Sequence, residues 1–214
     1  IIIGAGLTGL NTALALKEQE ESLAVAIVDK DVYPTGASTR NAGFACFGSI
    51  TELNADIQGM SEDEVWHLVE QRYRGLQKLL QKVDATAIDY HQNGGYEVFF
   101  DKDDELYNAS LERMDEYNHK LKQITGHADV FHSANGHIEK FGFASIMGMI
   151  GNPLEGQLHP GKLVAGVRNL VKEAGVELLT GFEVAGLEQR ENNKLVQSAA
   201  GLQLSASSVV VANN

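Results

Sequence analysis

The apolar positions of this chain fall into short runs separated by stretches with helical spacing. Residues 1–3 and 24–28 form two such runs, and leucines and alanines recur three and four positions apart between them. Short runs that are apolar throughout are typical of strands buried on both faces, and a strand–helix–strand order predicts a parallel sheet. The same order returns later, where residues 161–174 predict a helix and residues 176–180 and 207–212 predict two more buried strands.

Between these ends the pattern changes and predicts two long helices with a hairpin. Apolar residues recur at helical spacing across residues 61–83, and this helix opens with the Ser-x-x-Glu spacing of a capping box. Residues 103–124 predict the second helix. Short runs at residues 86–89 and 96–100, joined through an Asn-Gly-Gly turn, predict a β-hairpin.

The last part of the chain predicts a meander of short antiparallel strands. Its three runs alternate apolar and polar residues, at 182–187, 195–199 and 202–204. Together these elements predict an α/β fold in which a Rossmann-like nucleotide-binding domain includes the β-meander. We expect this domain to comprise residues 1–83 and 156–214, interrupted by an α+β insert at residues 84–155 that forms part of a substrate domain.

Composition narrows the classes of partner. The 214 residues are 43% hydrophobic and 21% charged, and a net charge of −12 disfavours nucleic acid and acidic membrane surfaces. A single cysteine, Cys46, excludes an internal disulfide and a cysteine-rich metal site, and it fits a cytoplasmic setting. The histidines scattered between residues 119 and 137 match no metal-site spacing, so we expect no metal. No stretch is long and apolar enough to predict a membrane span.

The first strand–helix–strand unit carries the strongest chemical signal. Gly4-Ala5-Gly6-Leu7-Thr8-Gly9 lies between strand and helix, and Asp29 ends the second strand, twenty positions after Gly9. In a dinucleotide-binding turn, the first glycine allows the tight turn, the second lets a diphosphate approach the backbone, and the third lets helix and strand pack closely. The helix N-terminus attracts the diphosphate, and the acid accepts hydrogen bonds from a ribose. The alternative, a glycine-rich turn of an ordinary α/β protein, is disfavoured by this context.

A segment rich in small and hydroxyl-bearing residues follows the acid, at residues 30–49. Its centre, residues 36–48, has the composition of a backbone that lies against a flat ligand and donates hydrogen bonds to phosphates. A flexible surface loop is the alternative, which the presence of Phe44, Cys46 and Phe47 disfavours. We expect Cys46 to be a small buried residue; a reactive thiol or a covalent link to a cofactor are the other roles considered.

With these segments in place, the chain resembles the D-amino acid oxidase family of FAD-dependent oxidoreductases, which includes glycine oxidase and sarcosine oxidase. The likeness spans nearly the whole chain in the family's order. The residues that carry it are 1–9, Val28-Asp29-Lys30, Gly36-Ala37-Ser38 with Arg40-Asn41-Ala42-Gly43-Phe44, Gly156-Gln157-Leu158-His159-Pro160 with Lys162-Leu163-Val164, Gly175-Val176, Val184 and 209–213. The resemblance implies an FAD-binding Rossmann-like domain with a β-meander.

The resemblance also implies where FAD would bind. The glycines of the turn would lie under the diphosphate, which Leu7 and Thr8 would bind. Asp29 and Lys30 would contact the adenosine ribose, and Asp29 stands where the family more often has glutamate. The remaining implied contacts are Ala37 and Ser38 at the phosphates, Asn41, Ala42, Gly43 and Phe44 along the ribityl chain and flavin ring, Val184 at the adenine, and Ala212 with Asn213 at the closing edge.

The chemistry that the resemblance implies is oxidation of the C–N bond of an amine or amino acid. A hydride leaves the C–H beside the nitrogen for flavin N5, and water hydrolyses the resulting imine. The substrate enters as the free amine, and no obligatory acid–base side chain is implied, so no catalytic residue is assigned. Arg40 is a candidate for polarising a flavin ring oxygen or holding a substrate carboxylate; an ion pair with an outer loop is the alternative.

Part of the family's machinery lies outside this sequence. The chain starts without Met in a predicted strand and stops just after another, so we expect a piece of a longer protein. The family's second glycine-rich segment and most of its substrate-anchoring residues belong to that later half, so we expect this part alone to bind FAD poorly and to be inactive. The alternative functions are an NAD-linked dehydrogenase, and a flavin-binding domain of an RNA-modifying or non-catalytic protein; a flavin absorbance spectrum and peroxide release distinguish them.

Overall fold

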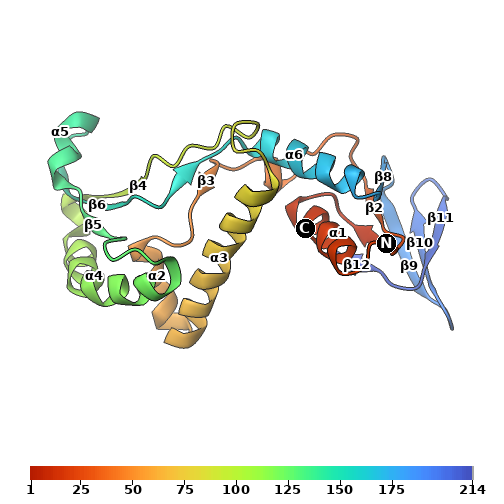
Figure 1. The fold of residues 1–214 in the computed structure, drawn as a ribbon, viewed down its shortest axis with the longest axis horizontal. Helices are drawn as coiled ribbons and strands as arrows, with labels where there is room; N and C mark the ends of the chain where they lie inside the picture. Colours follow the sequence, from red (N-terminus) through yellow and green to blue (C-terminus); the bar gives the residue numbers. More distant parts are fainter. Residues whose placement is uncertain (214) are drawn as a thin grey trace. The chain divides into compact units, whose positions relative to one another are not determined.

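A computed structural model of the chain describes residues 1–213 (Figure 1). The described residues divide into two compact units. The first consists of Ile1–Ala42 together with the chain from His159 onward, and the second consists of Gly43–Leu158. The first unit is therefore discontinuous in sequence, and the second is inserted within it.

The centre of the first unit is a four-stranded parallel sheet with the strand order β12-β1-β2-β8. Its strands are β1 (Ile2–Ile3), β2 (Ala26–Asp29), β8 (Glu177–Thr180) and β12 (Val210–Val211). Ile2 of β1 aligns with Ile27 of β2, and both side chains are buried. The burial explains why these runs are apolar throughout, and the parallel sheet predicted from them is confirmed.

Two helices of the first unit pack against each other, α1 (Leu7–Gln19) and α6 (Pro160–Glu173). Leu10 and Ala13 of α1 and Val164 of α6 are completely buried, so the apolar positions seen in the sequence form the packed faces. α6 begins with a proline in its first turn, where no N–H partner is needed. Gly175 follows α6 with a φ of +74°, a backbone conformation that ends helices and favours glycine.

The predicted meander is present as a three-stranded antiparallel sheet with the order β11-β10-β9. Its strands are β9 (Val184–Gln189), β10 (Lys194–Ser198) and β11 (Gln203–Ala206). Val196 of β10 is completely buried and packs in one cluster with Val28 of β2 and with Phe182. The meander therefore shares a core with the end of strand β2.

The second unit combines α-helices, of which α3 and α4 are long, with small antiparallel sheets (Figure 1). Its helices are α2 (Ile50–Gly59), α3 (Glu62–Lys82) and α4 (Asp104–Thr125), with a short α5 (Ile138–Phe141). One sheet has the order β4-β6-β5, from β4 (Gly95–Phe100), β5 (His132–Ser133) and β6 (Ile146–Asn152); the other pairs β3 (Phe44–Ala45) with β7 (Gly156–Gln157). Short 3₁₀ turns are η1 (Ala37–Thr39) in the first unit, and η2 (Asp101–Asp103) and η3 (Asn135–His137) in the second.

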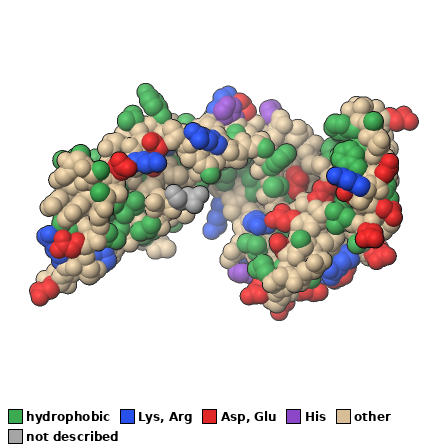
Figure 2. Space-filling view, turned by 180° about the vertical axis from the view of Figure 1, so that it is seen from behind, with side chains coloured by type: hydrophobic (Ala, Val, Ile, Leu, Met, Phe, Trp, Pro, Cys, Tyr) green, Lys and Arg blue, Asp and Glu red, His purple; other side chains and the backbone are tan. Residues whose placement is uncertain are grey.

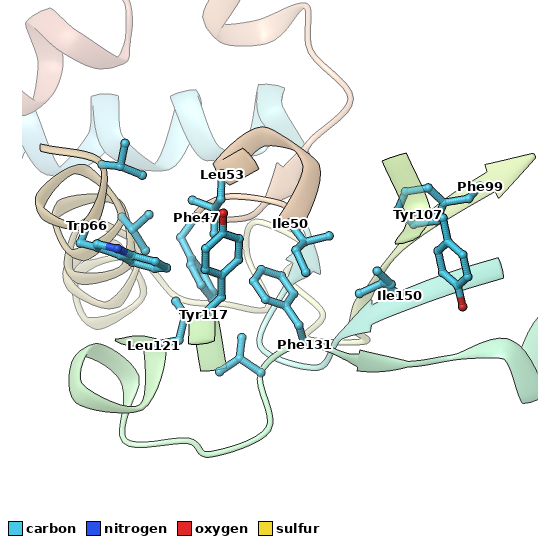
Figure 3. Packing of buried hydrophobic residues seen from close by; sticks show 13 residues of the cluster. Phe47, Ile50, Leu53, Trp66, Phe99, Tyr107, Tyr117, Leu121, Phe131 and Ile150 are labelled. Atoms are coloured by element: carbon cyan, nitrogen blue, oxygen red, sulfur yellow. The ribbon is translucent and has the colours of Figure 1, made fainter. Parts of the chain in front are cut away.

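The core of the second unit is built from large side chains of its helices and of the sheet (Figure 3). The rings of Trp66 on α3 and Tyr117 on α4 meet edge to face with their centroids 5.4 Å apart. The Tyr117 hydroxyl donates to Asn54 Oδ1 of α2 at 2.8 Å, and Asn54 Nδ2 donates to Ser110 Oγ at 3.1 Å. These bonds satisfy buried polar groups, so α2 and α4 are joined by hydrogen bonds, while α3 is joined to α4 by the ring contact.

The termini of the long helices follow the local sequence. Ser61 and Glu64 form the predicted capping box at the start of α3, where Glu64 Oε2 accepts the Ser61 N–H at 3.0 Å. α4 ends before Gly126, whose φ of +80° lies in the left-handed region. Both helices predicted for this part of the chain are therefore confirmed within two residues at each end.

The predicted hairpin of residues 86–89 and 96–100 is wrong. Residues 85–89 form turns, because the Asp84 carboxylate accepts both the N–H and the hydroxyl of Thr86, at 2.9 and 2.8 Å. β4 pairs instead with β6, a seven-residue strand that the sequence pattern did not predict. The sequence analysis also missed α2, whose N-cap Ser49 accepts the Glu52 N–H at 3.3 Å.

The first junction between the units differs from the boundary expected at residue 83. Residues 43–83 belong to the second unit, because Ile50 and Leu53 of α2 and Val65 of α3 are buried in its core. The return to the first unit at residue 159 lies three positions after the expected residue 156. The nucleotide-binding and substrate-binding roles expected of the two parts stay a prediction.

Most of the acidic residues lie in the second unit. On the face that Figure 2 shows, the acidic side chains are spread out rather than gathered in one patch.

Among residues 1–213, no helix has the length and apolarity that crossing a membrane would require.

Candidate functional site

The glycine-rich turn joins β1 to α1, and its first and third glycines are required by close backbone contacts. Gly4 has a φ of +110°, and a Cβ at this position would lie 2.7 Å from the carbonyl oxygen of Ala212. A Cβ at Gly9 would overlap the carbonyl oxygen of Gly4 and lie 3.3 Å from the side chain of Ile2. Only glycine therefore lets α1 start so close to β1, which is the packing expected of a dinucleotide-binding turn.

The second glycine leaves the start of α1 open toward the chain that follows β2. Gly6 is the N-cap of α1 and offers no side chain to the free N–H groups of the first turn. Ser38 of η1 takes that role from a distance, because its Oγ accepts the Leu7 N–H at 3.0 Å. A Cβ at Gly6 would lie 3.1 Å from the same oxygen. The structure thus brings the two segments expected at the phosphates, residues 4–9 and Ser38, into contact.

Asp29 is turned toward the glycine turn. It ends β2, is half-buried, and its Oδ2 accepts the Ala5 N–H at 2.6 Å. Its Oδ1 accepts the Asp31 N–H at 2.9 Å. The two bonds fix the carboxylate beside the turn, as a ribose-binding acid requires, and they leave it acceptor capacity for ligand hydroxyls. Lys30, the next residue, is exposed.

The end of the described chain lies on the other side of the turn. β12 runs beside β1, and the Ala212 N–H donates to the carbonyl oxygen of Ile3 at 2.8 Å. Asn213 N would lie 3.0 Å from a Cβ at Gly4. Val184 starts β9 two residues after Phe182, whose N–H donates to the Asp29 carbonyl at 2.8 Å. Ala212, Asn213 and Val184 therefore all belong to the part of the first unit that surrounds the turn and the acid.

The segment expected along the flavin is divided between the two units. Asn41 Nδ2 donates to the carbonyl oxygens of Ala37 and Ser38 at 3.0 and 3.2 Å, which folds residues 37–41 into a compact loop. Ala42 is the last residue of this part of the first unit. Gly43 and Phe44 belong to the second unit, where the Gly43 carbonyl accepts the Leu158 N–H at 2.8 Å.

Cys46 is exposed, so the prediction that it is buried is wrong. Side chains alternate in direction along this extended stretch, and Ala45 and Phe47 take the buried positions while Phe44 and Cys46 point to solvent. The Phe44 side chain is 77% exposed. Partial burial of the Cys46 thiol raises its pKa, and the nearby carboxylates of Glu155 and Glu52 raise it further. A raised pKa makes the thiol a poor nucleophile at neutral pH.

The residues of the first unit fit the adenine half of a dinucleotide. They provide a turn that tolerates only glycine at two positions, the N-terminus of the thirteen-residue helix α1, which starts at this turn, and a fixed carboxylate beside the turn. Such a constellation matches the diphosphate by backbone N–H groups and the ribose by a carboxylate. Among residues 1–213, no group of histidine, cysteine and acidic side chains is placed to hold a metal ion.

Comparison with protein-family models identifies the family of the chain that carries this site. The model of the FAD dependent oxidoreductase family, DAO, matches residues 1–214. The chain belongs to this family. The family depends on FAD, which decides between the two dinucleotides considered for the turn and excludes the NAD-linked alternative.

Solved structures with the same fold are numerous, and three of them illustrate the likeness. Glycine oxidase from Bacillus cereus is 23% identical, with a TM-score of 0.65 over 99% of this chain and 54% of its own. L-proline dehydrogenase from P. horikoshii is 20% identical, with a TM-score of 0.68 over 100% of this chain and 52% of its own. L-amino acid deaminase from Proteus vulgaris is 23% identical, with a TM-score of 0.67 over 99% of this chain and 46% of its own.

The chain thus spans about half the length of the solved structures that it matches, and at these identities the likeness shows the fold alone. Among curated protein sequences, no significant match is found. Another DAO-fold structure, L-α-glycerophosphate oxidase from Mycoplasma pneumoniae, contains bound FAD and is 16% identical, with a TM-score of 0.65.

Proposed function

We propose that the protein containing this chain oxidises the C–N bond of an amine or amino acid, with FAD as the electron acceptor. The observation that carries the proposal is the contact between the glycine turn, Ser38 and Asp29, in a chain that belongs to the FAD-dependent oxidoreductase family. When bound, FAD supplies the chemistry by accepting a hydride from the carbon beside the nitrogen. The residues of this chain bind and orient it.

Each residue of the turn has a distinct part in that binding. The first N–H groups of α1 would donate to the diphosphate, where Gly6 leaves room for close approach. Ser38 accepts the Leu7 N–H, so its own hydroxyl proton would remain available to donate to a phosphate. Asp29 would accept hydrogen bonds from the ribose hydroxyls, and its charge would disfavour a 2′-phosphate at that place.

The remaining predicted contacts complete the site. Lys30 would reach the ribose, Ala37 the phosphates, and Val184 the adenine through its backbone. Asn41, Ala42, Gly43 and Phe44 would line the ribityl chain and flavin ring, and Ala212 with Asn213 would close the edge. Arg40, which is exposed and follows directly on η1, would hold a substrate carboxylate or polarise the flavin; an ion pair with an outer loop is the alternative.

The proposed substrate class rests on what the structural neighbours are named for. Glycine oxidase, L-proline dehydrogenase, L-amino acid deaminase and iminodiacetate oxidase are named for amino acids or amines. L-α-Glycerophosphate oxidase, also a neighbour, is named for a polyol phosphate. The free amine would be the reactive form, because its lone pair assists loss of the hydride. A cytoplasmic setting, expected from the single cysteine, is part of the same proposal.

The test uses the complete protein, expressed from its full-length gene and purified. We expect the absorption bands of oxidised flavin, and we expect them to bleach without oxygen when glycine, sarcosine, proline or D-amino acids are offered singly. In air, an oxidase would release hydrogen peroxide with the same substrates. A protein without flavin, or one whose flavin is reduced by glycerol phosphate and by none of the amines, would contradict the proposal.

A further inference from the structure

The second unit contains a small cavity between the start of α2 and the sheet β4-β6-β5. It is partly open to solvent, and its lining includes Ser49, Gly95, Glu97, Asn152 and Glu155. Two carboxyl groups thus border one small space, although acidic side chains seldom point into a protein interior. Neither of them is used by the proposed cofactor site.

Glu97 points inward from β4. It lies two residues before Phe99 and therefore on the same face of the strand, and Phe99 is 98% buried in the core of the unit. The start of α2 holds the Glu97 carboxylate, because Thr51 donates to it from its hydroxyl at 2.8 Å and from its backbone N–H at 3.4 Å. These two contacts anchor the Glu97 side chain at the start of α2.

Glu155 reaches the same face of β4 from the turn that follows β6. A Cβ at Gly95 would overlap the Glu155 carboxylate, and Gly95 lies two residues before Glu97. The Glu155 carboxylate therefore lies over Gly95, whose Cα is one strand repeat, roughly 7 Å, from the Cα of Glu97. Asn152 Nδ2 donates to Glu155 Oε1 at 3.3 Å.

The charges around Glu155 oppose its ionisation. Burial raises the pKa of Glu155 to about 7, and the carboxylates of Glu97 and Glu52 raise it while the bond from Asn152 lowers it. Arg72, the cation of this region, pairs with Glu52 at 2.7 Å. The Glu155 carboxylate also contributes to the raised pKa of the Cys46 thiol.

We propose that Glu155 carries a proton beside the Glu97 carboxylate, and that loss of this proton releases the turn of residues 152–155. Glu97 is fixed by α2, whereas Glu155 lies in a turn beside the exposed Pro153, so Glu155 is the member that moves. Two like charges in one cavity repel, and the side chain that can reach solvent relieves the repulsion by leaving. The chain thereby contains a pH-sensitive conformational device that operates without the cofactor.

The turn connects to two further strands. The Glu155 carbonyl accepts the Gly94 N–H at 3.0 Å, and the next residues form β7, which pairs with β3. Gln157 also exchanges backbone hydrogen bonds of 2.9 Å with His91 in both directions. Movement of Glu155 is therefore expected to loosen the bonds of residues 94 and 157, together with the β3–β7 ladder, while α3 and α4 stay ordered.

Amide hydrogen exchange of the complete protein, measured at about pH 5.5 and about pH 8.5 and corrected for the intrinsic rate, tests this proposal. We expect exchange in residues 152–158 to be about tenfold faster at the higher pH. Glu155→Gln keeps the side-chain shape without the charge and should remove the pH difference. Glu112→Gln, at an exposed acid on α4, is the matched control and should keep it.

A second measurement keeps the proposal testable even where a variant does not fold. The side-chain carboxyl carbon of Glu155 in the unmodified protein should titrate near pH 7 in an NMR experiment, and Glu97→Gln should lower its midpoint. A midpoint near the ordinary value of 4.5, a midpoint that Glu97→Gln leaves unchanged, or a pH difference in exchange that persists in Glu155→Gln would overturn the proposal.

Discussion

At the scale of single residues, the three glycines of the turn are required for different physical reasons. Gly4 and Gly9 are fixed by backbone atoms that a Cβ would meet, whereas Gly6 faces only the Ser38 hydroxyl at 3.1 Å. A backbone atom cannot move away, but a side chain can give by a few tenths of an ångström. Two of the glycines are therefore required by the fold, whereas Gly6 is not, which agrees with the proposal that Gly6 leaves room for the ligand.

This distinction predicts opposite outcomes for two alanine substitutions. Gly9→Ala should destabilise the protein by about 3 kcal/mol, because its Cβ overlaps a fixed carbonyl oxygen. Gly6→Ala should cost about 1 kcal/mol or less in stability yet weaken FAD binding at least about tenfold, because the Cβ occupies the place of the diphosphate. Denaturant unfolding and FAD titration of the complete protein measure the two effects. Equal losses of stability in both variants would contradict this assignment.

Glu155 predicts how stability depends on pH. Its folded pKa of about 7 exceeds the unfolded value of 4.5, so the folded state binds more protons between these values. The free energy of unfolding should therefore fall as pH rises from about 4.5 to about 7, by at most about 3 kcal/mol, with the full stabilisation present below 4.5. The difference between the unmodified protein and Glu155→Gln, from unfolding curves across this window, isolates the contribution. A gain in stability of the unmodified protein relative to Glu155→Gln as pH rises would contradict this prediction.

At the scale of elements, helices and buried parallel strands could be predicted from sequence because their signals are local. The capping box at Ser61 and Glu64 and the apolar spacing behind it define α3 without reference to any other segment. The pairing of β4 with β6 is not local, since Gly95 aligns with Asn152, and the Asn-Gly-Gly turn signalled a nearer partner. β6 was missed because its glycines and methionines do not alternate with polar residues.

One glycine inside a helix and one just after a helix give a prediction at this scale. Gly75 lies on the exposed face of α3 with no neighbouring atom within 4 Å of a Cβ, so Gly75→Ala should stabilise the protein by about 0.5–1 kcal/mol. Gly175 has a φ of +74° after α6, so Gly175→Ala should destabilise it by about 1 kcal/mol. Thermal unfolding of both variants is the measurement, and stabilisation by Gly175→Ala would contradict the structure.

At the scale of the whole molecule, the sequence predicted the local structure around the glycine turn better than the division into units. Glycine turn, acid and parallel sheet follow from one strand–helix–strand unit, and the structure brings Ser38 to them from 31 positions away. The boundary at residue 83 differs from the one in the structure because apolar side chains of α2 and α3 pack into the core of the second unit, which only packing reveals. The inward direction of Glu97 could have been predicted, because it lies two residues before the apolar Phe99 on one strand. Its nearness to Glu155 could not, because the two residues are far apart in the sequence.

The central claim is that an adenine dinucleotide lies with its diphosphate over the turn at Gly6 and its ribose against Asp29. A crystal structure of the complete protein with FAD tests it most directly. We expect the diphosphate within hydrogen-bonding distance of the first N–H groups of α1, and the ribose hydroxyls bonded to the Asp29 carboxylate. Density for FAD elsewhere in the molecule, or a ribose without contact to Asp29, would contradict the account.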